Sequence, residues 1–180
     1  MCNDQPILIV GCGSIGRRHA RNLRALGVES IAVVDPCQER MTPLVDEMGV
    51  QAFTDYDDAL RQVRPACVMV CSPPAFHVEQ ALAAVDAGAH LFVEKPLSDR
   101  LDGIDELIAR VDAANLVAQV GYNLRFHPVM VEIKSLLDGG AIGRVFYGRF
   151  EFAQYLPDWR PWQDHRASYT GRRELGGGMI

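Results

Sequence analysis

Over its first 120 residues the chain alternates short apolar runs with longer segments whose apolar residues recur at helical spacing. The short runs are mostly apolar on both faces, which is typical of strands in a sheet covered by helices on both sides. Strands are predicted at residues 7–10, 31–34, 50–53, 67–71, 91–93 and 116–120, and helices at residues 14–26, 39–48, 56–63, 75–87 and 101–114. This alternation indicates parallel strands with helical crossovers. The sequence therefore predicts an α/β fold with a doubly wound parallel sheet over residues 1–121.

The pattern changes after Gly121, where we place a domain boundary. A helix is predicted over residues 128–137, followed by a strand over residues 144–156. One face of that strand carries Phe146, Phe150, Phe152 and Leu156, and the other carries Tyr147, Arg149, Glu151 and Tyr155. We interpret residues 122–180 as the incomplete start of a second α/β domain with an open sheet, because one strand cannot bury its apolar face alone. We expect the natural chain to continue, and homo-oligomers to form through this sheet.

Composition limits the classes of partner. The 180 residues are 48% hydrophobic and 23% charged, as in ordinary globular proteins. The net charge is −5 and the basic residues are scattered, so no nucleic acid partner is expected. No apolar run approaches the roughly 20 residues of a membrane span, so we predict no membrane partner and a cytoplasmic location. The five cysteines form no C-x-x-C pair and have no His at metal-ligand spacing, so we predict reduced, mostly buried thiols and no metal.

A glycine-rich turn follows the first predicted strand and opens the first predicted helix. Its sequence is Gly11-Cys12-Gly13-Ser14-Ile15-Gly16. Gly11 permits the tight turn, Gly13 lets the backbone approach a pyrophosphate, and Gly16 lets helix and strand pack closely. The helix N-terminus adds N–H groups and the positive end of the helix dipole. The motif alone is weak, and a simple tight turn is the alternative, but its place between strand and helix favours a dinucleotide site.

Asp35 ends the second predicted strand, 19 residues after Gly16. A carboxylate there accepts hydrogen bonds from the adenosine ribose hydroxyls and repels a 2′-phosphate, which favours NAD over NADP. Arg40 nearby would soften this preference and leave NADP as a second cofactor. The alternative is a helix N-cap or turn residue before Pro36. A methyltransferase would use a similar glycine turn and acidic residue, so that class stays open at this point.

Further motifs follow the later predicted strands, at the sheet edge where open α/β sheets bind ligands. They are Ser72-Pro73-Pro74-Ala75-Phe76-His77, then Glu94-Lys95-Pro96, then Gly121-Tyr122-Asn123-Leu124-Arg125-Phe126-His127-Pro128. Together with the glycine turn, and in this order, they resemble the Gfo/Idh/MocA family of oxidoreductases over essentially the whole chain. The combination is specific although each motif alone is not. A methyltransferase does not explain Lys95 or the Ser72-Pro73-Pro74 segment.

The resemblance implies a Rossmann domain followed by an α/β domain, and reversible hydride transfer between NAD(P) and a hydroxyl carbon of a sugar, nucleotide sugar or cyclitol. It places Lys95 at the reacting hydroxyl and a cis peptide before Pro96. A lysine suits this task because the alcohol proton must be held as the hydride departs, and desolvation can bring an amine from a pKa of about 10.4 toward neutrality. Glu94 would orient that lysine or pair with another cation. A surface lysine before a turn proline is the alternative.

Two residue sets follow from the motifs and the resemblance, with Lys95 as the catalytic residue. Cofactor contacts are expected from Gly11, Gly13, Ser14, Ile15, Gly16, Asp35, Ser72, Pro73, His77, Glu94 and Asn123. Substrate contacts are expected from Lys95, Arg125, Trp159, Arg160 and Trp162. A structural histidine is the alternative for His77, and hydrogen bonds between domains are the alternative for Asn123 and Arg125.

The glycine run at residues 176–178 also resembles the family pattern, in which it leads into a strand that bears an Asp and a His for proton transfer. The chain ends before either, so we expect it to bind NAD but to oxidise no sugar by itself. Two other functions remain open. One is a glycoside-processing enzyme that uses bound NAD transiently, and the other is a non-catalytic NAD-binding sensor or regulatory protein.

Overall fold

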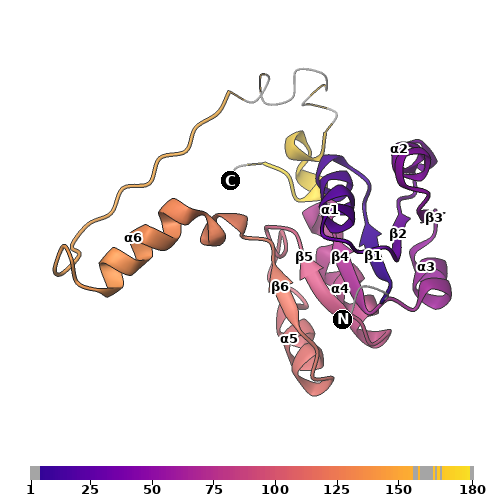
Figure 1. Ribbon diagram of the computed structural model, residues 1–180, viewed down its shortest axis with the longest axis horizontal. Coiled ribbons are helices and arrows are strands. Elements are labelled where there is room, and N and C mark those ends of the chain that lie inside the picture. Colours follow the sequence, from indigo (N-terminus) through magenta and orange to yellow (C-terminus); the bar gives the residue numbers. More distant parts are fainter. Residues whose placement is uncertain (1–4, 156–157, 159–163, 165, 167, 179–180) are drawn as a thin grey trace.

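The computed structural model describes residues 5–155, 158, 164, 166 and 168–178. Within these ranges six strands form one parallel sheet in the order β3-β2-β1-β4-β5-β6 (Figure 1). The strands are β1 (Ile7–Val10), β2 (Ile31–Val34), β3 (Gln51–Phe53), β4 (Cys67–Val70), β5 (His90–Val93) and β6 (Ala118–Val120). The predicted doubly wound sheet is confirmed, with small differences at the strand ends.

The strand order reverses between β1 and β4. The register places Val10 at the end of β1 opposite both Val34 of β2 and Val70 of β4. Val93 of β5 lies opposite Val70, and Val120 of β6 lies opposite Val93. The carboxyl ends of these strands therefore form one edge, and the chain segments that follow them meet there. Open α/β sheets bind their ligands at such an edge, beside the reversal of strand order.

Helices cover both faces of the sheet. They are α1 (Ser14–Ala25), α2 (Gln38–Met48), α3 (Tyr56–Val63), α4 (His77–Asp86) and α5 (Ile104–Ala113). Successive strand residues point to opposite faces, so each strand contributes to two cores. Leu8 belongs to the core that contains residues of α3, α4 and α5, whereas Ile9 belongs to the core that contains residues of α1 and α2. Both side chains are fully buried.

Local backbone geometry shifts two predicted helix starts. Gly103 precedes α5 with a φ of +78°, which only glycine adopts freely, so this helix begins at Ile104 rather than at residue 101. Before α4 the chain forms a 3-10 turn, η1 (Pro74–Phe76), with Pro74 at its first position. The helix predicted from residue 75 therefore begins at His77. The fixed φ of proline suits the first position of a helical turn.

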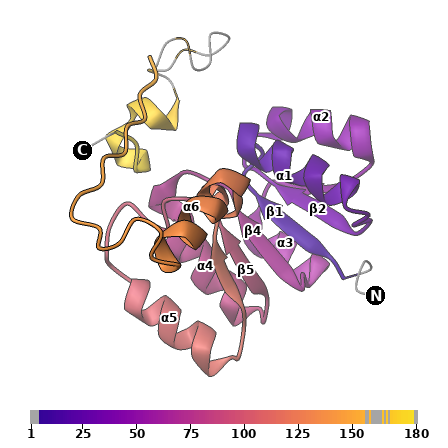
Figure 2. The ribbon, with the colours of Figure 1, turned by 60° about the vertical axis from the view of Figure 1, so that its left-hand side comes forward.

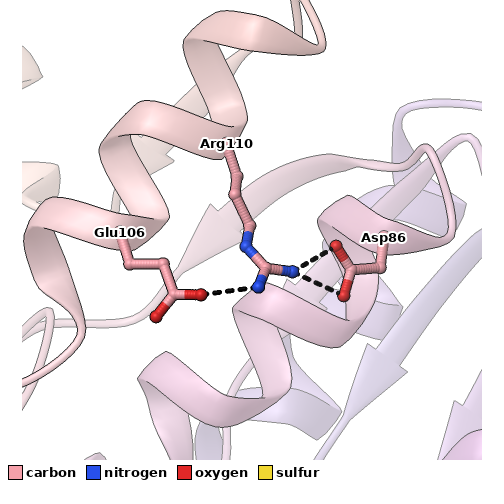
Figure 3. A network of polar contacts seen from close by, with 3 residues as sticks. All are labelled: Asp86, Glu106 and Arg110. Carbon is pink, nitrogen blue, oxygen red and sulfur yellow. Dashed lines mark hydrogen bonds and ion pairs between the residues drawn. The ribbon is translucent and has the colours of Figure 1, made fainter.

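An ion-pair network joins α4 to α5 on the surface (Figure 3). Both oxygens of Asp86 on α4 accept hydrogen bonds from Nη1 of Arg110 on α5, at 2.6 and 2.8 Å. Nη2 of Arg110 donates to Oε1 of Glu106, one turn earlier on α5, at 2.5 Å. Because these side chains are solvent-exposed, their contribution to stability is small. The position of α5 beside α4 depends mainly on the hydrophobic core that residues of both helices share.

Beyond β6 the chain leaves the sheet. It forms a 3-10 turn, η2 (Asn123–Phe126), and then α6 (Pro128–Asp138), which extends away from the strands (Figure 1). The strand predicted over residues 144–156 is wrong for its described part, since residues 144–155 form no strand. Strand structure needs a hydrogen-bonded neighbour, and these residues pair with no strand of the described chain. Phe146, Phe150 and Phe152 are 86–91% exposed as a result.

Residues 168–178 return to the first part of the chain (Figure 2). They form two short 3-10 turns, η3 (Tyr169–Gly171) and η4 (Arg173–Leu175). Gly176 follows η4 and lies close to residues of the first part of the chain. A Cβ added to Gly176 would lie 2.9 Å from the Cβ atoms of both Asp99 and Pro74. The predicted glycine run thus packs beside the segment that follows β4.

None of the helices in the described ranges combines the length and apolar character needed to cross a membrane.

Candidate functional site

The glycine turn between β1 and α1 packs tightly against the end of β4. Gly11 has a φ of +90°, and a Cβ there would lie 2.8 Å from the backbone nitrogen of Ser72. A Cβ at Gly16 would lie 1.9 Å from the carbonyl oxygen of Gly11. Both positions therefore exclude a side chain, because backbone atoms cannot move away at low cost. The predicted roles of Gly11 and Gly16 in turn geometry and close packing are in accord with these contacts.

Gly13 differs from its two neighbours in the motif. No atom lies within 4 Å of the position that its Cβ would occupy. Gly13 is also the N-cap of α1, with no side-chain cap, and the first turn of α1 contains no acidic residue. Ser14 and Ile15 in that turn thus lie at the positive end of the helix dipole. An open backbone approach beside a helix N-terminus fits a pyrophosphate.

Asp35 connects the glycine turn to the segment after β2. Its carboxylate is buried, with Oδ2 accepting a hydrogen bond from the Cys12 backbone N–H at 2.9 Å and Oδ1 accepting one from the Cys37 backbone N–H at 2.9 Å. Nη1 of Arg40 lies 3.6 Å from Oδ1. Two carboxylate oxygens offer about four lone pairs, so further donors can be accepted. Asp35 thus acts as a turn residue, which is one alternative from the sequence. Its side chain is 3% exposed, and its contact with ribose hydroxyls stays a prediction.

The cysteines around this turn are structural. Cys12 and Cys71 are buried, and all four described cysteines, Cys12, Cys37, Cys67 and Cys71, are free thiols. Burial, followed by the charge of Asp35, raises the pKa of Cys12 to about 12. Its thiol is therefore neutral and unreactive near pH 7. The four described cysteines are free, as predicted, but Cys37 and Cys67 are only partly buried, and Cys2 lies outside the described residues.

His77 joins the segments that follow β4 and β5. The residue is 1% exposed. Nε2 lies 2.8 Å from the carbonyl oxygen of Ser72, and Nδ1 lies 2.9 Å from that of Pro96. Ser72 Oγ donates to Oε1 of Gln80 at 2.6 Å, and Pro73 is the N-cap of η1. Both His77 nitrogens thus contact protein carbonyls, which favours the structural role, and its predicted cofactor contact stays a prediction.

Glu94 follows β5 and pairs with His19, a partner that sequence reasoning did not identify. Its Oε1 accepts a hydrogen bond from Nε2 of His19 on α1 at 2.7 Å, between side chains that are 17% and 12% exposed. Its Oε2 accepts one from the Lys95 backbone N–H at 3.3 Å. His19 also packs edge-on against Phe92, with ring centroids 5.1 Å apart. The sequence signal was a histidine on the buried stripe of α1, four residues after Ile15 and four before Leu23.

Lys95 lies at the surface of this edge. The Lys95-Pro96 peptide is cis, as the resemblance implied. Asn123 and Arg125 lie in η2, directly after β6, and both are exposed. The parallel register brings the ends of β5 and β6 together, so Lys95 and η2 belong to the same edge of the sheet. Trp159, Arg160 and Trp162 lie outside the described residues.

Comparisons with known proteins agree on one family. The model of the Gfo/Idh/MocA oxidoreductase family, with an NAD-binding Rossmann fold, matches residues 6–122. The uncharacterized oxidoreductase YrbE of Bacillus subtilis is 34% identical over 137 residues, covering 75% of this chain and 40% of that protein. Myo-inositol 2-dehydrogenase of Thermotoga maritima is 30% identical over 138 residues, covering 76% and 41%. The crystal structure of scyllo-inositol dehydrogenase from Lactobacillus casei with bound NAD(H) and scyllo-inositol has a TM-score of 0.71 at 31% identity, covering 78% and 42%.

The chain spans about two fifths to one half of the length of the curated relatives that it matches. The family match extends over more than half of the chain and includes the whole parallel sheet. It also contains the glycine turn, Asp35 and the Lys95 segment. The predicted fold and the expectation of a nicotinamide cofactor are confirmed at the level of the family. The chain belongs to the Gfo/Idh/MocA family of NAD-binding oxidoreductases.

Proposed function

We propose that this chain holds NAD along the carboxyl edge of its sheet. The observation that carries the proposal is the contrast within the glycine turn. Gly11 and Gly16 are closed by backbone atoms, whereas Gly13 faces open space at the start of α1. If close packing were the only role of glycine in this turn, atoms of neighbouring segments would also lie next to Gly13. Space for a pyrophosphate beside free helix N–H groups explains all three positions.

NAD is the preferred form of the cofactor in this proposal. The Asp35 carboxylate at the end of β2 would accept hydrogen bonds from the adenosine ribose and would repel a 2′-phosphate. Its two backbone contacts, to Cys12 and Cys37, hold it in place without neutralising its charge. Arg40, at 3.6 Å, offsets part of that charge and leaves NADP as a weaker second ligand.

We further propose that the protein to which this chain belongs is an oxidoreductase acting on a hydroxyl carbon of a cyclitol, sugar or nucleotide sugar. When bound, the cofactor supplies the acceptance or return of a hydride. Lys95 would hold the hydroxyl proton, and its position two residues after the end of β5, at the carboxyl edge of the sheet, supports this role. Arg125 in η2 would contact the substrate, together with Trp159, Arg160 and Trp162. The relatives named inositol dehydrogenases support a cyclitol as the first substrate to test.

The proposal includes a division into two domains. Residues 1–121 would form the dinucleotide-binding domain, and residues 122–180 would belong to a substrate domain. The end of the sheet at Val120 and the end of the family match at residue 122 support this division. Oligomerisation through the second domain stays a prediction without support from residues 144–155, which form no strand.

A two-step experiment tests the proposed function. Calorimetry would first measure NAD and NADP binding to the chain, for which we expect NAD to bind more tightly. Tighter NADP binding would contradict the role of Asp35. A screen of myo-inositol, scyllo-inositol and sugars for NADH formation by a protein that contains this chain would then test the reaction. NADH formation with a cyclitol supports the proposed substrate class, and turnover of non-carbohydrate alcohols alone would contradict it.

A further inference from the structure

The His19 and Glu94 side chains meet across the sheet edge, 75 residues apart in sequence. His19 comes from the second turn of α1, and Glu94 from the first residue after β5. A Cβ added to Gly121, directly after β6, would lie 3.2 Å from Oε1 of Glu94. The carboxylate thus lies among α1 and the ends of β5 and β6. It is largely enclosed, and its side chain is 12% exposed.

The Glu94 carboxylate is negatively charged near neutral pH. Burial opposes ionisation, but the hydrogen bond and charge of His19, together with the Lys95 backbone N–H and the Lys95 charge, outweigh it and lower the pKa of Glu94. The charge of Glu94 also acts on the Cys71 thiol, whose pKa is raised, chiefly by burial, so that it stays neutral. Glu94 therefore brings a negative charge to this edge, and the hydrogen bond from His19 orients its carboxylate.

The position of this charge along a bound dinucleotide follows from the strand order. In the proposed function, on which this inference rests, Asp35 after β2 takes the adenosine ribose and the glycine turn after β1 takes the pyrophosphate. The bound dinucleotide would span the point where the strand order reverses. Its nicotinamide half would therefore lie beyond β4 and β5. Glu94 is the first residue after β5. Its carboxylate is therefore on the nicotinamide side of the pyrophosphate.

The two redox forms of the cofactor differ in charge at that end. The nicotinamide ring carries one positive charge when oxidised and none when reduced. We propose that Glu94, held in place by His19, strengthens the binding of NAD⁺ relative to NADH. Lys95 brings a positive charge to the same edge, and Glu94 offsets the repulsion between this ammonium and the oxidised ring. Because the carboxylate is partly enclosed, its attraction is screened less than that of a surface charge.

Binding measurements on the chain itself test this inference without any turnover. Calorimetry would give the dissociation constants of NAD⁺ and NADH for the wild type and four variants. Glu94→Gln removes the charge at nearly constant shape. His19→Gln keeps an N–H donor for the carboxylate, and His19→Leu removes it. Glu29→Gln is the matched control, because Glu29 is an exposed carboxylate before β2, at the opposite edge of the sheet.

We expect Glu94→Gln to weaken NAD⁺ binding about fivefold or more while NADH binding changes less than about twofold. His19→Leu should reproduce part of this selective loss, whereas His19→Gln and Glu29→Gln should keep the wild-type ratio of the two constants. Equal weakening of both forms by Glu94→Gln, or no weakening, would overturn the inference and leave the proposed function intact. An unchanged ratio in His19→Leu would overturn the role of His19. A wild-type chain that binds neither form would contradict the proposed function and this inference together.

Discussion

Gly16 on α1 contacts the backbone of Gly11 so closely that a methyl group on Gly16 would lie 1.9 Å from the Gly11 carbonyl oxygen. Gly16→Ala should therefore force α1 away from β1. We expect a loss of about 1–3 kcal/mol or more in the free energy of unfolding, the range for overpacking of a close contact. Urea denaturation followed by circular dichroism measures it. Wild-type stability in Gly16→Ala would show that the turn is looser than the structure indicates.

Asp35 should contribute both to the turn and to the choice of cofactor. Asp35→Ser removes the carboxylate that would repel a 2′-phosphate, so the ratio of NADP to NAD affinity should rise. One hydroxyl oxygen cannot replace the two carboxylate oxygens that accept from the Cys12 and Cys37 backbone N–H groups, so stability should fall by about 1–3 kcal/mol. Calorimetry with both cofactors and a parallel thermal melt measure the two effects. An unchanged cofactor ratio would mean that Asp35 serves the turn alone.

The His19–Glu94 contact should make part of the stability depend on pH. The pKa of Glu94 is lowered in the folded state, so its contribution is present above the unfolded value of about 4.3 and is lost as the pH falls through the lower folded value. The difference in unfolding free energy between wild type and Glu94→Gln should thus be largest above about pH 5 and shrink in stronger acid. Urea denaturation across this range measures it. A difference independent of pH would contradict the assigned cause.

Lys95→Ala should lower turnover by roughly 100- to 10,000-fold in a protein that contains this chain and oxidises a cyclitol, the range for a lost general acid or base. NAD affinity should not fall, because the pyrophosphate and ribose contacts are elsewhere and because the substitution removes the repulsion between the Lys95 ammonium and the oxidised ring. Steady-state kinetics and calorimetry separate the two quantities. Turnover within a few-fold of the wild type would place the proton transfer on another residue.

The sheet and most of its helices could be predicted because their signals are local. Continuous apolar strands such as Ile31–Val34 and amphipathic helices such as Ser14–Ala25 carry their period in the sequence. The strand expected at residues 144–156 could not be judged in this way. Alternation describes a surface suited to a sheet, but a strand also needs a neighbour, and the described residues contain none for this segment.

The sequence could predict those parts of the candidate site in which the role of a residue depends on its own backbone conformation, as at Gly11 with its positive φ. The His19–Glu94 contact could not be predicted, because it depends on how α1 packs over β5 and joins residues 75 positions apart. The place of His77 beside the motif suggested either a cofactor contact or a structural role, and the carbonyl oxygens of Ser72 and Pro96 beside its ring nitrogens favour the structural role.

Gly13→Val tests the central claim most directly, because the substitution should disturb the cofactor and not the fold. The backbone of Gly13, with φ −67° and ψ −169°, suits any residue, and no atom lies within 4 Å of the added Cβ. Calorimetric titration of NAD into wild type and Gly13→Val, with thermal melts of both, should show equal stability and NAD binding weakened roughly 5- to 150-fold, the equivalent of about 1–3 kcal/mol of overpacking against a pyrophosphate. Undiminished NAD binding by a stable Gly13→Val chain would contradict the claim that the glycine turn holds the cofactor.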